Sequence, residues 1–238
     1  MEHSWNGGER IDTALEAERA TDRNVRPARV IACGMIAREV LAVRALCGLD
    51  HVELVALPAQ WHFEPHRIAA GVAAAVAEAR ENGIEDVFVG YADCGTGGEL
   101  AALCRELSVT MLPGPHCFAI YQAERPSEAT IERDLRTFYV TDFLARQPDA
   151  FLWRPLGLDR HPELTPLYFG AYEAVAYLAQ TEDDDLLASA RRIAERLGLR
   201  FEKRATGYGD LPDLIARWDA ERSAVSSPAP LAHAKGAT

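Results

Sequence analysis

A strand pattern, a glycine turn and a helix start follow one another in the stretch Asp86-Val87-Phe88-Val89-Gly90-Tyr91-Ala92-Asp93-Cys94-Gly95-Thr96-Gly97-Gly98-Glu99-Leu100. Residues 86–90 are apolar, β-branched and aromatic, which predicts a buried strand. Residues 98–107 carry apolar side chains at the spacing of an amphipathic helix. Cys94 therefore stands where a strand ends and a glycine-rich turn opens a helix. Because open α/β sheets bind ligands at the carboxyl ends of their strands, this turn is a candidate functional site.

Strand-like and helix-like segments alternate on both sides of this stretch. Strands are predicted over residues 28–32, 51–57, 86–90, 109–112, 137–140 and 200–203. Helices are predicted over residues 35–46, 65–82, 98–107, 116–122, 167–180, 184–197 and 211–218. This alternation predicts an α/β fold with a doubly wound, mostly parallel, Rossmann-like sheet and additional C-terminal helices.

The composition divides the chain into three parts. Residues 1–26 form a polar and charged N-terminal arm, residues 27–222 the α/β domain, and residues 223–238 a tail rich in Ser, Ala and Pro that is predicted to be disordered. The 238 residues suffice to bury a sizeable core.

The net charge of −11 argues against a nucleic-acid binder and against binding to anionic membranes. No apolar run reaches the roughly 18 residues that span a bilayer. The acidic N-terminal residues also lack the pattern of a signal peptide, so the protein is expected in the cytoplasm.

The five cysteines are an odd number without tight spacing. In a reducing compartment this indicates buried thiols, metal ligands or catalytic thiolates rather than a disulfide framework. Cys47 and Cys104 fall inside or at the ends of predicted helices and are interpreted as packing residues.

Other side chains that can bind metals follow the ends of successive predicted strands. They are, in the order of their weight as ligands, Cys94, then Cys117 and Cys33, then His116 and His62. In a parallel sheet all of them reach one edge, which predicts a metal site there. Zinc is ranked first for these donors, with iron, nickel, cobalt or an iron–sulfur cluster as alternatives. Thiol catalysis without a metal, or plain packing of the cysteines, is the competing interpretation.

The glycine turn has two interpretations. The N–H groups of Gly95, Gly97 and Gly98, with the dipole of the following helix, could hold an anionic group of a substrate. The turn lacks the Lys-Ser/Thr pair of a P-loop, and it could equally serve to shape the backbone around Cys94. Thr96 could hydrogen-bond either Cys94 or a ligand.

Three further residues are candidates of lower weight. Asp93 and Asp142 could act as general bases or orient a ligand histidine, although capping or solvated carboxylates are more common. Tyr208, in the turn Thr206-Gly207-Tyr208-Gly209, is expected to return toward the sheet edge as a substrate-binding residue. The candidate catalytic residues are thus Asp93, Thr96 and Asp142.

A set of motifs resembles one uncharacterised prokaryotic family, a domain of unknown function. The motifs are Ala-Cys-Gly at 32–34, Leu-Pro-Ala with His62 at 57–62, Tyr-Ala-Asp-Cys-Gly-Thr-Gly-Gly at 91–98, Gly-Pro-His-Cys at 114–117, Thr-Asp-Phe at 141–143 and Thr-Gly-Tyr-Gly at 206–209. The resemblance covers about residues 28–218. Genes of this family often neighbour corrinoid-dependent methyltransferase systems for methylamines and betaines. The resemblance therefore implies one-carbon metabolism and groups the Cys and His candidates as one set, without supplying a reaction.

Together these observations predict a metal-dependent enzyme of one-carbon or methylated-amine metabolism that acts on a small, anionic molecule. The first alternative is a metal- or cofactor-handling accessory protein of a corrinoid methyltransferase system. The second is an iron–sulfur protein.

Overall fold

The strands of the described chain form two separate sheets, and both are purely parallel. The computed structural model describes residues 26–122 and 128–225. The first sheet has the order β2-β1-β3-β4 and the second the order β5-β6-β7. Helices connect the parallel strands, so the predicted α/β class is confirmed. Residues 1–25 of the expected arm and residues 226–238 of the expected tail lie outside the described residues.

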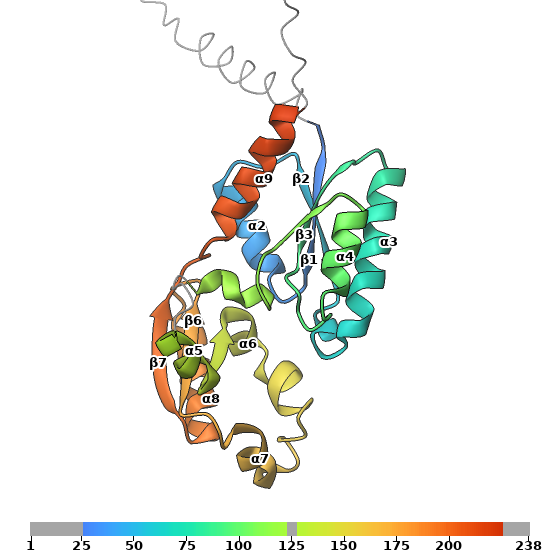
Figure 1. The fold of residues 1–238 in the computed structure, drawn as a ribbon. Coiled ribbons are helices and arrows are strands. Elements are labelled where there is room, and N and C mark those ends of the chain that lie inside the picture. The colour runs from blue at the N-terminus through green and yellow to red at the C-terminus, as the bar shows by residue number, and fades with distance from the viewer. Residues whose placement is uncertain (1–25, 123–127, 226–238) are drawn as a thin grey trace, which may run out of the picture.

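The first sheet, with its helices, forms a first lobe. Its strands are β1 (Ala28–Cys33), β2 (Val52–Leu57), β3 (Asp86–Gly90) and β4 (Thr110–Met111). Helices α2 (Ala37–Leu46) and α9 (Leu211–Val225) cover one face, and α3 (Ile68–Glu81) and α4 (Glu99–Glu106) cover the other (Figure 1). Short helices of this lobe are η1 (Ala59–Phe63), η2 (Pro65–Arg67) and η3 (Cys117–Tyr121). Strand β1 is buried along its whole length because it lies between two strands and two helical layers.

The second sheet forms a second lobe. Its strands are β5 (Thr137–Thr141), β6 (Ala174–Ala179) and β7 (Arg200–Ala205). Its helices are α5 (Glu128–Leu135), α6 (Asp142–Arg146), α7 (Thr165–Phe169), α8 (Asp184–Leu197) and the short η4 (Asp149–Trp153) and η5 (Pro162–Leu164). Helix α8 has the bounds that the sequence predicts, because the Asp183 side chain caps its first turn and Gly198 ends it in a left-handed conformation.

One predicted helix is wrong. The stretch 167–180 contains the end of α7, a turn and then strand β6. The aromatic residues that suggested one helical stripe therefore lie on separate elements, with Phe169 on α7 and Tyr177 on β6. Every residue of β6 is buried, since it is the central strand of its sheet. A strand that is buried on both faces shows no alternation, which removes the sequence signal that separates it from a helix.

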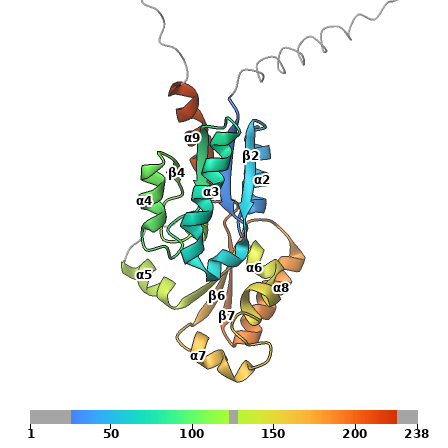
Figure 2. The ribbon, with the colours of Figure 1, turned by 90° about the vertical axis from the view of Figure 1, so that its right-hand side faces the viewer.

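The carboxyl ends of the two sheets face each other (Figures 1 and 2). Met35, just after β1, packs against both hydrophobic cores. Phe63 of the first lobe stacks on Phe151 of the second, with ring centroids 6.1 Å apart. Leu178, near the end of β6, belongs to the core of the first lobe. Residues that follow the strand ends of either lobe therefore meet between the lobes.

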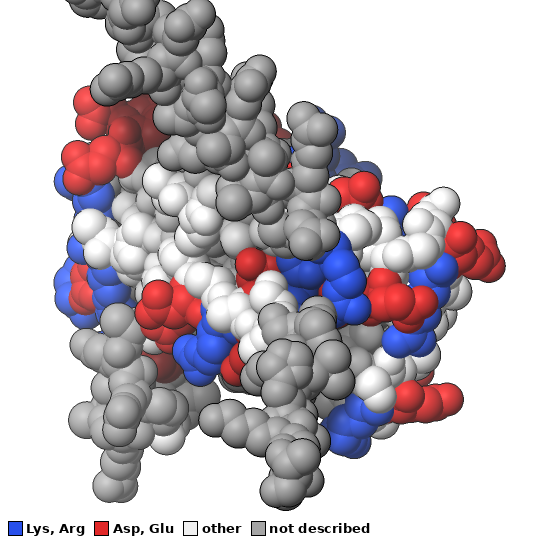
Figure 3. Space-filling view, turned by 90° about the horizontal axis from the view of Figure 1, so that it is seen from above, with Lys and Arg blue, Asp and Glu red and all other residues white. Residues whose placement is uncertain are grey.

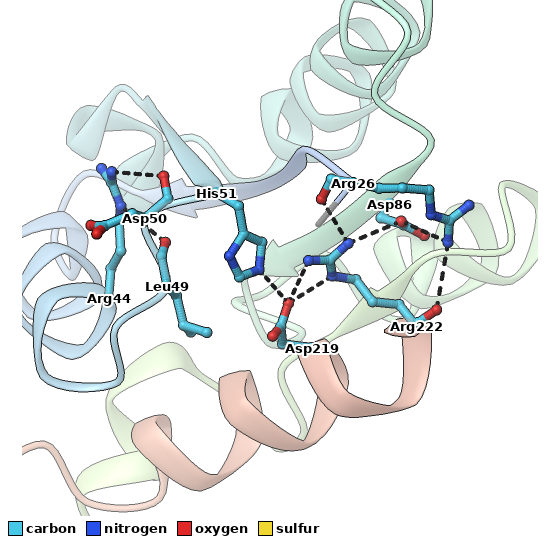
Figure 4. Close-up of polar contacts among 8 residues, drawn as sticks. All are labelled: Arg26, Arg44, Leu49, Asp50, His51, Asp86, Asp219 and Arg222. Atoms are coloured by element: carbon cyan, nitrogen blue, oxygen red, sulfur yellow. Dashed lines mark hydrogen bonds and ion pairs between the residues drawn. The ribbon is translucent and has the colours of Figure 1, made fainter. Parts of the chain in front are cut away.

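The opposite, amino edge of the first sheet is bound to α9 by an ionic network (Figure 4). The Arg222 side chain contacts Asp86 at 3.2 Å and Asp219 at 2.6 Å. Asp219 also lies 2.8 Å from Nε2 of His51. Because Arg222 is almost fully buried, this network fixes the C-terminal helix on the first lobe.

Acidic and basic side chains are interspersed on the face seen in Figure 3. The described residues of this face therefore form no single acidic patch. Within residues 26–122 and 128–225, no helix has the length and apolar character needed to cross a bilayer.

Candidate functional site

Cys94 lies four residues past the end of β3, in a loop of unusual backbone conformation. Its φ of +48° falls in the left-handed region, as do those of Gly95 (+82°), Gly97 (+63°) and Gly98 (+90°). A non-glycine residue rarely adopts such a φ, so neighbouring contacts must hold Cys94 in place. The Cys94 side chain remains partly exposed.

The glycine turn folds around the carboxylate of Asp93. The Gly98 N–H donates to Oδ1 at 2.7 Å, and the Gly97 N–H donates to Oδ2 at 3.3 Å. The Thr96 hydroxyl lies 3.1 Å from Oδ1 and 2.8 Å from the Asp93 carbonyl oxygen. These contacts, that of Gly98 foremost, hold the pKa of Asp93 below its usual range. The anion that this turn binds is thus one of the chain's own, which favours the loop-shaping interpretation of Gly95, Gly97, Gly98 and Thr96.

Two backbone hydrogen bonds join this loop to the loop that follows β4. The Asp93 N–H donates to the Gly114 carbonyl oxygen at 3.2 Å, and the Cys94 N–H donates to that of Pro115 at 2.8 Å. Cys117 then begins η3 with its side chain buried. Its sulfur lies 3.5 Å from the sulfur of Cys94. The sequence prediction that these two thiols share a site agrees with this geometry.

Cys33 completes what we call the thiol cluster, which consists of Cys33, Cys94 and Cys117. It is the last residue of β1 and is 3% exposed. Hydrogen bonding with Cys117 lowers the pKa of both Cys33 and Cys94, although burial opposes both shifts. The same two bonds, with burial, raise the pKa of Cys117. Cys117 is therefore the thiol of the cluster that gives up its proton least readily.

Tyr91 adds a hydroxyl group that the sequence analysis did not assign to the site. The side chain is 1% exposed, and its hydroxyl has no hydrogen-bond partner of good geometry in the described structure. It lies near enough to Cys33 to lower the pKa of that thiol. Burial, followed by the charge of Cys33, raises the pKa of Tyr91. Its place directly after a strand was the available signal, but a tyrosine there usually belongs to the core.

His62 and His116 lie beside aromatic rings. His62, on η1, contacts the ring of Phe63 edge-on, with centroids 5.2 Å apart. His116 stacks on Phe118 at 3.9 Å. Loss of water around each ring lowers the pKa of both histidines, and the proximity of His62 lowers that of His116 further. The structure thus brings the two imidazoles near each other in their neutral form, but neither hydrogen-bonds a sulfur of the described chain.

A buried carboxyl group and a buried hydroxyl group between the lobes were also missed. Glu39, in the first turn of α2, is 5% exposed, and its Oε2 atom has no hydrogen-bond partner among the described residues. Burial first, and then the charge of Asp142, raises the pKa of Glu39. The hydroxyl of Tyr121 on η3 is likewise buried without a partner in the described chain, and Glu39 is among the charges that raise its pKa after burial. The available signal was an acidic residue beside Val40 and Val43 on the apolar face of the helix.

Asp142 connects the strand ends of the second lobe. Its Oδ1 accepts hydrogen bonds from the Tyr177 hydroxyl at 2.7 Å and the Gln180 N–H at 3.1 Å. Its Oδ2 accepts from the N–H and the hydroxyl of Thr181 at 3.0 and 2.6 Å. Because both oxygens accept hydrogen bonds, these contacts favour a structural role for Asp142 over a role as a general base.

Tyr208 packs against the core of the first lobe. The Asp210 N–H donates to the Ile120 carbonyl oxygen at 2.9 Å, which fixes the turn beside η3. Tyr208 also interacts electrostatically with Tyr121.

The remaining cysteines differ from each other. Cys104 is buried in α4, as expected of a packing residue, but Cys47 is exposed where α2 ends, so its interpretation as a packing residue is wrong. In the described parts of the chain, no three His, Cys, Asp or Glu side chains stand in positions that could hold a metal ion without rearrangement.

Comparison with known proteins gives a family but no activity. A family model described as "Protein of unknown function (DUF1638)" matches residues 56–215, which is more than half of the chain. The match includes His62, Cys94, His116 and Cys117, whereas Cys33 lies before it. Neither the curated proteins nor the solved structures contain a match to this chain. The chain therefore belongs to the DUF1638 family of proteins of unknown function.

Proposed function

We propose that this chain is a metal-binding protein in which Cys33, Cys94 and Cys117 hold one metal ion, and that it acts as a metal-dependent enzyme. The observation that carries the proposal is the thiol cluster itself. Three sulfurs from three separate elements interact with one another at the carboxyl edge of a parallel sheet. Such an edge is where α/β folds bind ligands, and the second lobe covers it here.

The spacing of the sulfurs supports a single ion better than a cluster. Two thiolates at about 2.3 Å from a tetrahedral zinc ion lie about 3.8 Å apart. The sulfurs of Cys94 and Cys117 are 3.5 Å apart, close to this value. In a [4Fe–4S] cluster each cysteine binds a different iron, which needs ligand sulfurs that are farther apart. Zinc is therefore the proposed metal, with Cys33 as the third ligand.

The ionisation of the cluster also suits a cation. The pKa values of Cys33 and Cys94 are lowered, and thiolate is the form that binds metals. The pKa of Cys117 is raised, so this thiol is the one that a metal ion has most work to deprotonate. A zinc ion with three protein ligands would keep a fourth position, where it could lower the pKa of a bound water, thiol or amine.

The neighbouring tyrosine and glutamate side chains would bind a substrate rather than the metal. The Tyr91 and Tyr121 hydroxyl groups and the Glu39 carboxyl group are buried and lack partners within the described chain. Such groups are expected to gain hydrogen bonds from a bound molecule or from water. The neutral imidazoles of His62 and His116 could replace one thiolate as a ligand or border the open position.

The link to one-carbon or methylated-amine metabolism rests on the motif resemblance alone. It extends the proposal to a substrate of that class and to a corrinoid methyltransferase system as the partner. The buried position of Cys33 and Cys117 favours a resident metal ion over an ion that is passed on to a partner protein.

Metal analysis by mass spectrometry would test this proposal on untagged, full-length protein purified without oxygen. We expect about one zinc ion per chain, a loss of nearly all of it in Cys94→Ala, and full retention in the matched control Cys104→Ala. Iron with visible absorbance would instead support the iron–sulfur alternative. A Cys94→Ala variant that keeps its full metal content, or wild-type protein without metal after zinc is supplied, would refute the site.

A further inference from the structure

The Cys94–Cys117 pair has a geometry that allows a second reaction. The two sulfurs lie 3.5 Å apart, and a disulfide bond is about 2.0 Å long, so they need to approach by about 1.5 Å. The two backbone hydrogen bonds between their loops keep the residues side by side.

We propose that Cys94 and Cys117 form an oxidation site, which peroxide converts into an intramolecular disulfide. The solvent exposure of each sulfur determines which cysteine reacts with peroxide first. Cys94 is partly exposed, whereas Cys117 is only 6% exposed and Cys33 3% exposed. Peroxide therefore reaches Cys94 first, and Cys117 is the thiol that resolves the product.

The chemistry balances with hydrogen peroxide as the oxidant. The Cys94 sulfur attacks one peroxide oxygen, the O–O bond breaks, and the second oxygen leaves as water with the proton that the Cys94 thiol gives up. Cys94 is then a sulfenic acid. The Cys117 sulfur attacks the Cys94 sulfur, the S–O bond breaks, and the hydroxyl group leaves as water with the proton of Cys117. In sum, two thiols and one peroxide give one disulfide and two waters.

The other cysteines are poorly placed for this reaction. Cys104 is buried in α4, and Cys47 is exposed at the C-terminal end of α2, with no hydrogen bond to another cysteine in the described structure. Cys33 also interacts with Cys117, but it is the most buried member of the cluster. The disulfide is accordingly expected between residues 94 and 117, which also removes two of the three proposed metal ligands. Only this coupling to the metal rests on the proposed function.

The disulfide can be tested on full-length, metal-free protein. The reduced chain is treated with one equivalent of hydrogen peroxide, alkylated, and mapped by peptide mass spectrometry. We expect two of the five free thiols to disappear and a single linked peptide pair that contains Cys94 and Cys117, reversed by dithiothreitol. Overoxidation of Cys94 without a linked pair, or a disulfide between Cys33 and Cys117, would overturn the proposal.

Two variants make the test specific. In Cys117→Ser the sulfenic acid on Cys94 should persist and react with dimedone, whereas the exposed-site control Cys47→Ser should form the disulfide as the wild type does. Circular dichroism verifies that each variant is folded. If Cys117→Ser is unfolded, Cys33→Ser is used in its place and should still form the disulfide between Cys94 and Cys117. A folded Cys33→Ser protein that does not form this disulfide would contradict its assignment to Cys94 and Cys117.

A second experiment, on protein to which zinc has been added, tests disulfide formation and metal binding separately. If both hold, peroxide releases about one zinc ion per disulfide, detected with a chromogenic chelator. If the metal proposal fails, no zinc loads, but the disulfide still forms in the first experiment. If the disulfide proposal fails, the protein loads zinc and shows no linked peptide.

Discussion

The backbone N–H of Cys94 donates a hydrogen bond to the carbonyl oxygen of Pro115, with a donor–acceptor distance of 2.8 Å. This bond joins the loop after β3 to the loop after β4. It brings the sulfurs of Cys94 and Cys117 within 3.5 Å of each other although 23 positions separate them in the chain. The candidate site thus depends on how two loops pack, and substitutions in these loops should report on it.

Asp93→Asn should destabilise the protein at neutral pH and loosen the Cys94 loop. The wild-type carboxylate accepts hydrogen bonds from Gly97, Gly98 and Thr96, and its pKa is lowered. A lowered pKa stabilises the fold above the unfolded-state pKa of about 4, and this stability is lost as the pH falls through the folded-state pKa.

Urea unfolding at pH 7 and near pH 3 would measure this difference. The gap between the wild type and Asp93→Asn should be largest at pH 7 and shrink in acid. Glu99→Gln, which neutralises an exposed carboxylate nearby, is the control and should show little change. An equal loss at both pH values would contradict the role of the charge.

Glu39→Gln should change the stability in the opposite direction from Asp93→Asn, so that the variant is the more stable protein at high pH. Burial raises the pKa of Glu39, so the folded state holds its proton at a pH where the unfolded state has released it. Wild-type stability therefore falls as the pH rises from the unfolded-state pKa of about 4.3 through the folded-state pKa. Gln mimics the protonated form, so the variant should be more stable than the wild type at pH 8 and similar at pH 4.

Denaturant titrations at these two pH values check the Glu39 prediction. The charges that face the carboxyl group come from Asp142, Arg146 and Arg38, and all three remain in the variant. Glu182→Gln serves as an exposed control. A Glu39→Gln protein that is less stable at both pH values would show that the carboxylate accepts a needed hydrogen bond.

Gly209→Ala should destabilise the protein far more than Gly207→Ala. Both glycines have a φ of +54°, but a Cβ at 209 would lie 2.0 Å from the Ile120 carbonyl oxygen, whereas a Cβ at 207 meets no atom within 4 Å. We expect a cost of about 1 kcal/mol at 207 from backbone conformation, and of about 3 kcal/mol or more at 209. Thermal unfolding of the two variants isolates the steric effect of the added Cβ. Equal losses of stability would contradict the close approach of residue 209 to the Ile120 carbonyl oxygen.

Asp142→Asn should cost about 3 kcal/mol, because an amide cannot accept the hydrogen bonds that both oxygens of this buried carboxylate receive. Tyr177→Phe removes one of the donors and should cost about 1 kcal/mol. Chemical denaturation measures both. If Asp142→Asn keeps wild-type stability, the carboxylate is not structural, and a direct role in the site would regain support.

Local sequence patterns predicted much of the first lobe. The apolar segment 86–90 forms β3, Cys33 ends β1, and Cys94 and Cys117 come after β3 and β4, because strand propensity and glycine turns are local properties. In the stretch 167–180, local patterns predicted a helix where the structure has a strand. The segment Ala174–Ala179 is rich in residues that also suit helices, and only its place between β5 and β7 makes it a strand.

The sequence by itself determined the α/β class, the positions of the cysteines after their strands and the left-handed glycine turn beside Cys94, since each depends on neighbours in the chain. Only the tertiary structure decided that the strands divide into two sheets with facing carboxyl edges. It also decided that the glycine turn binds Asp93, and that Glu39 and Tyr121 are buried without partners among the described residues. The physical reason is that strand order and loop packing arise from contacts between distant segments, which no local pattern encodes.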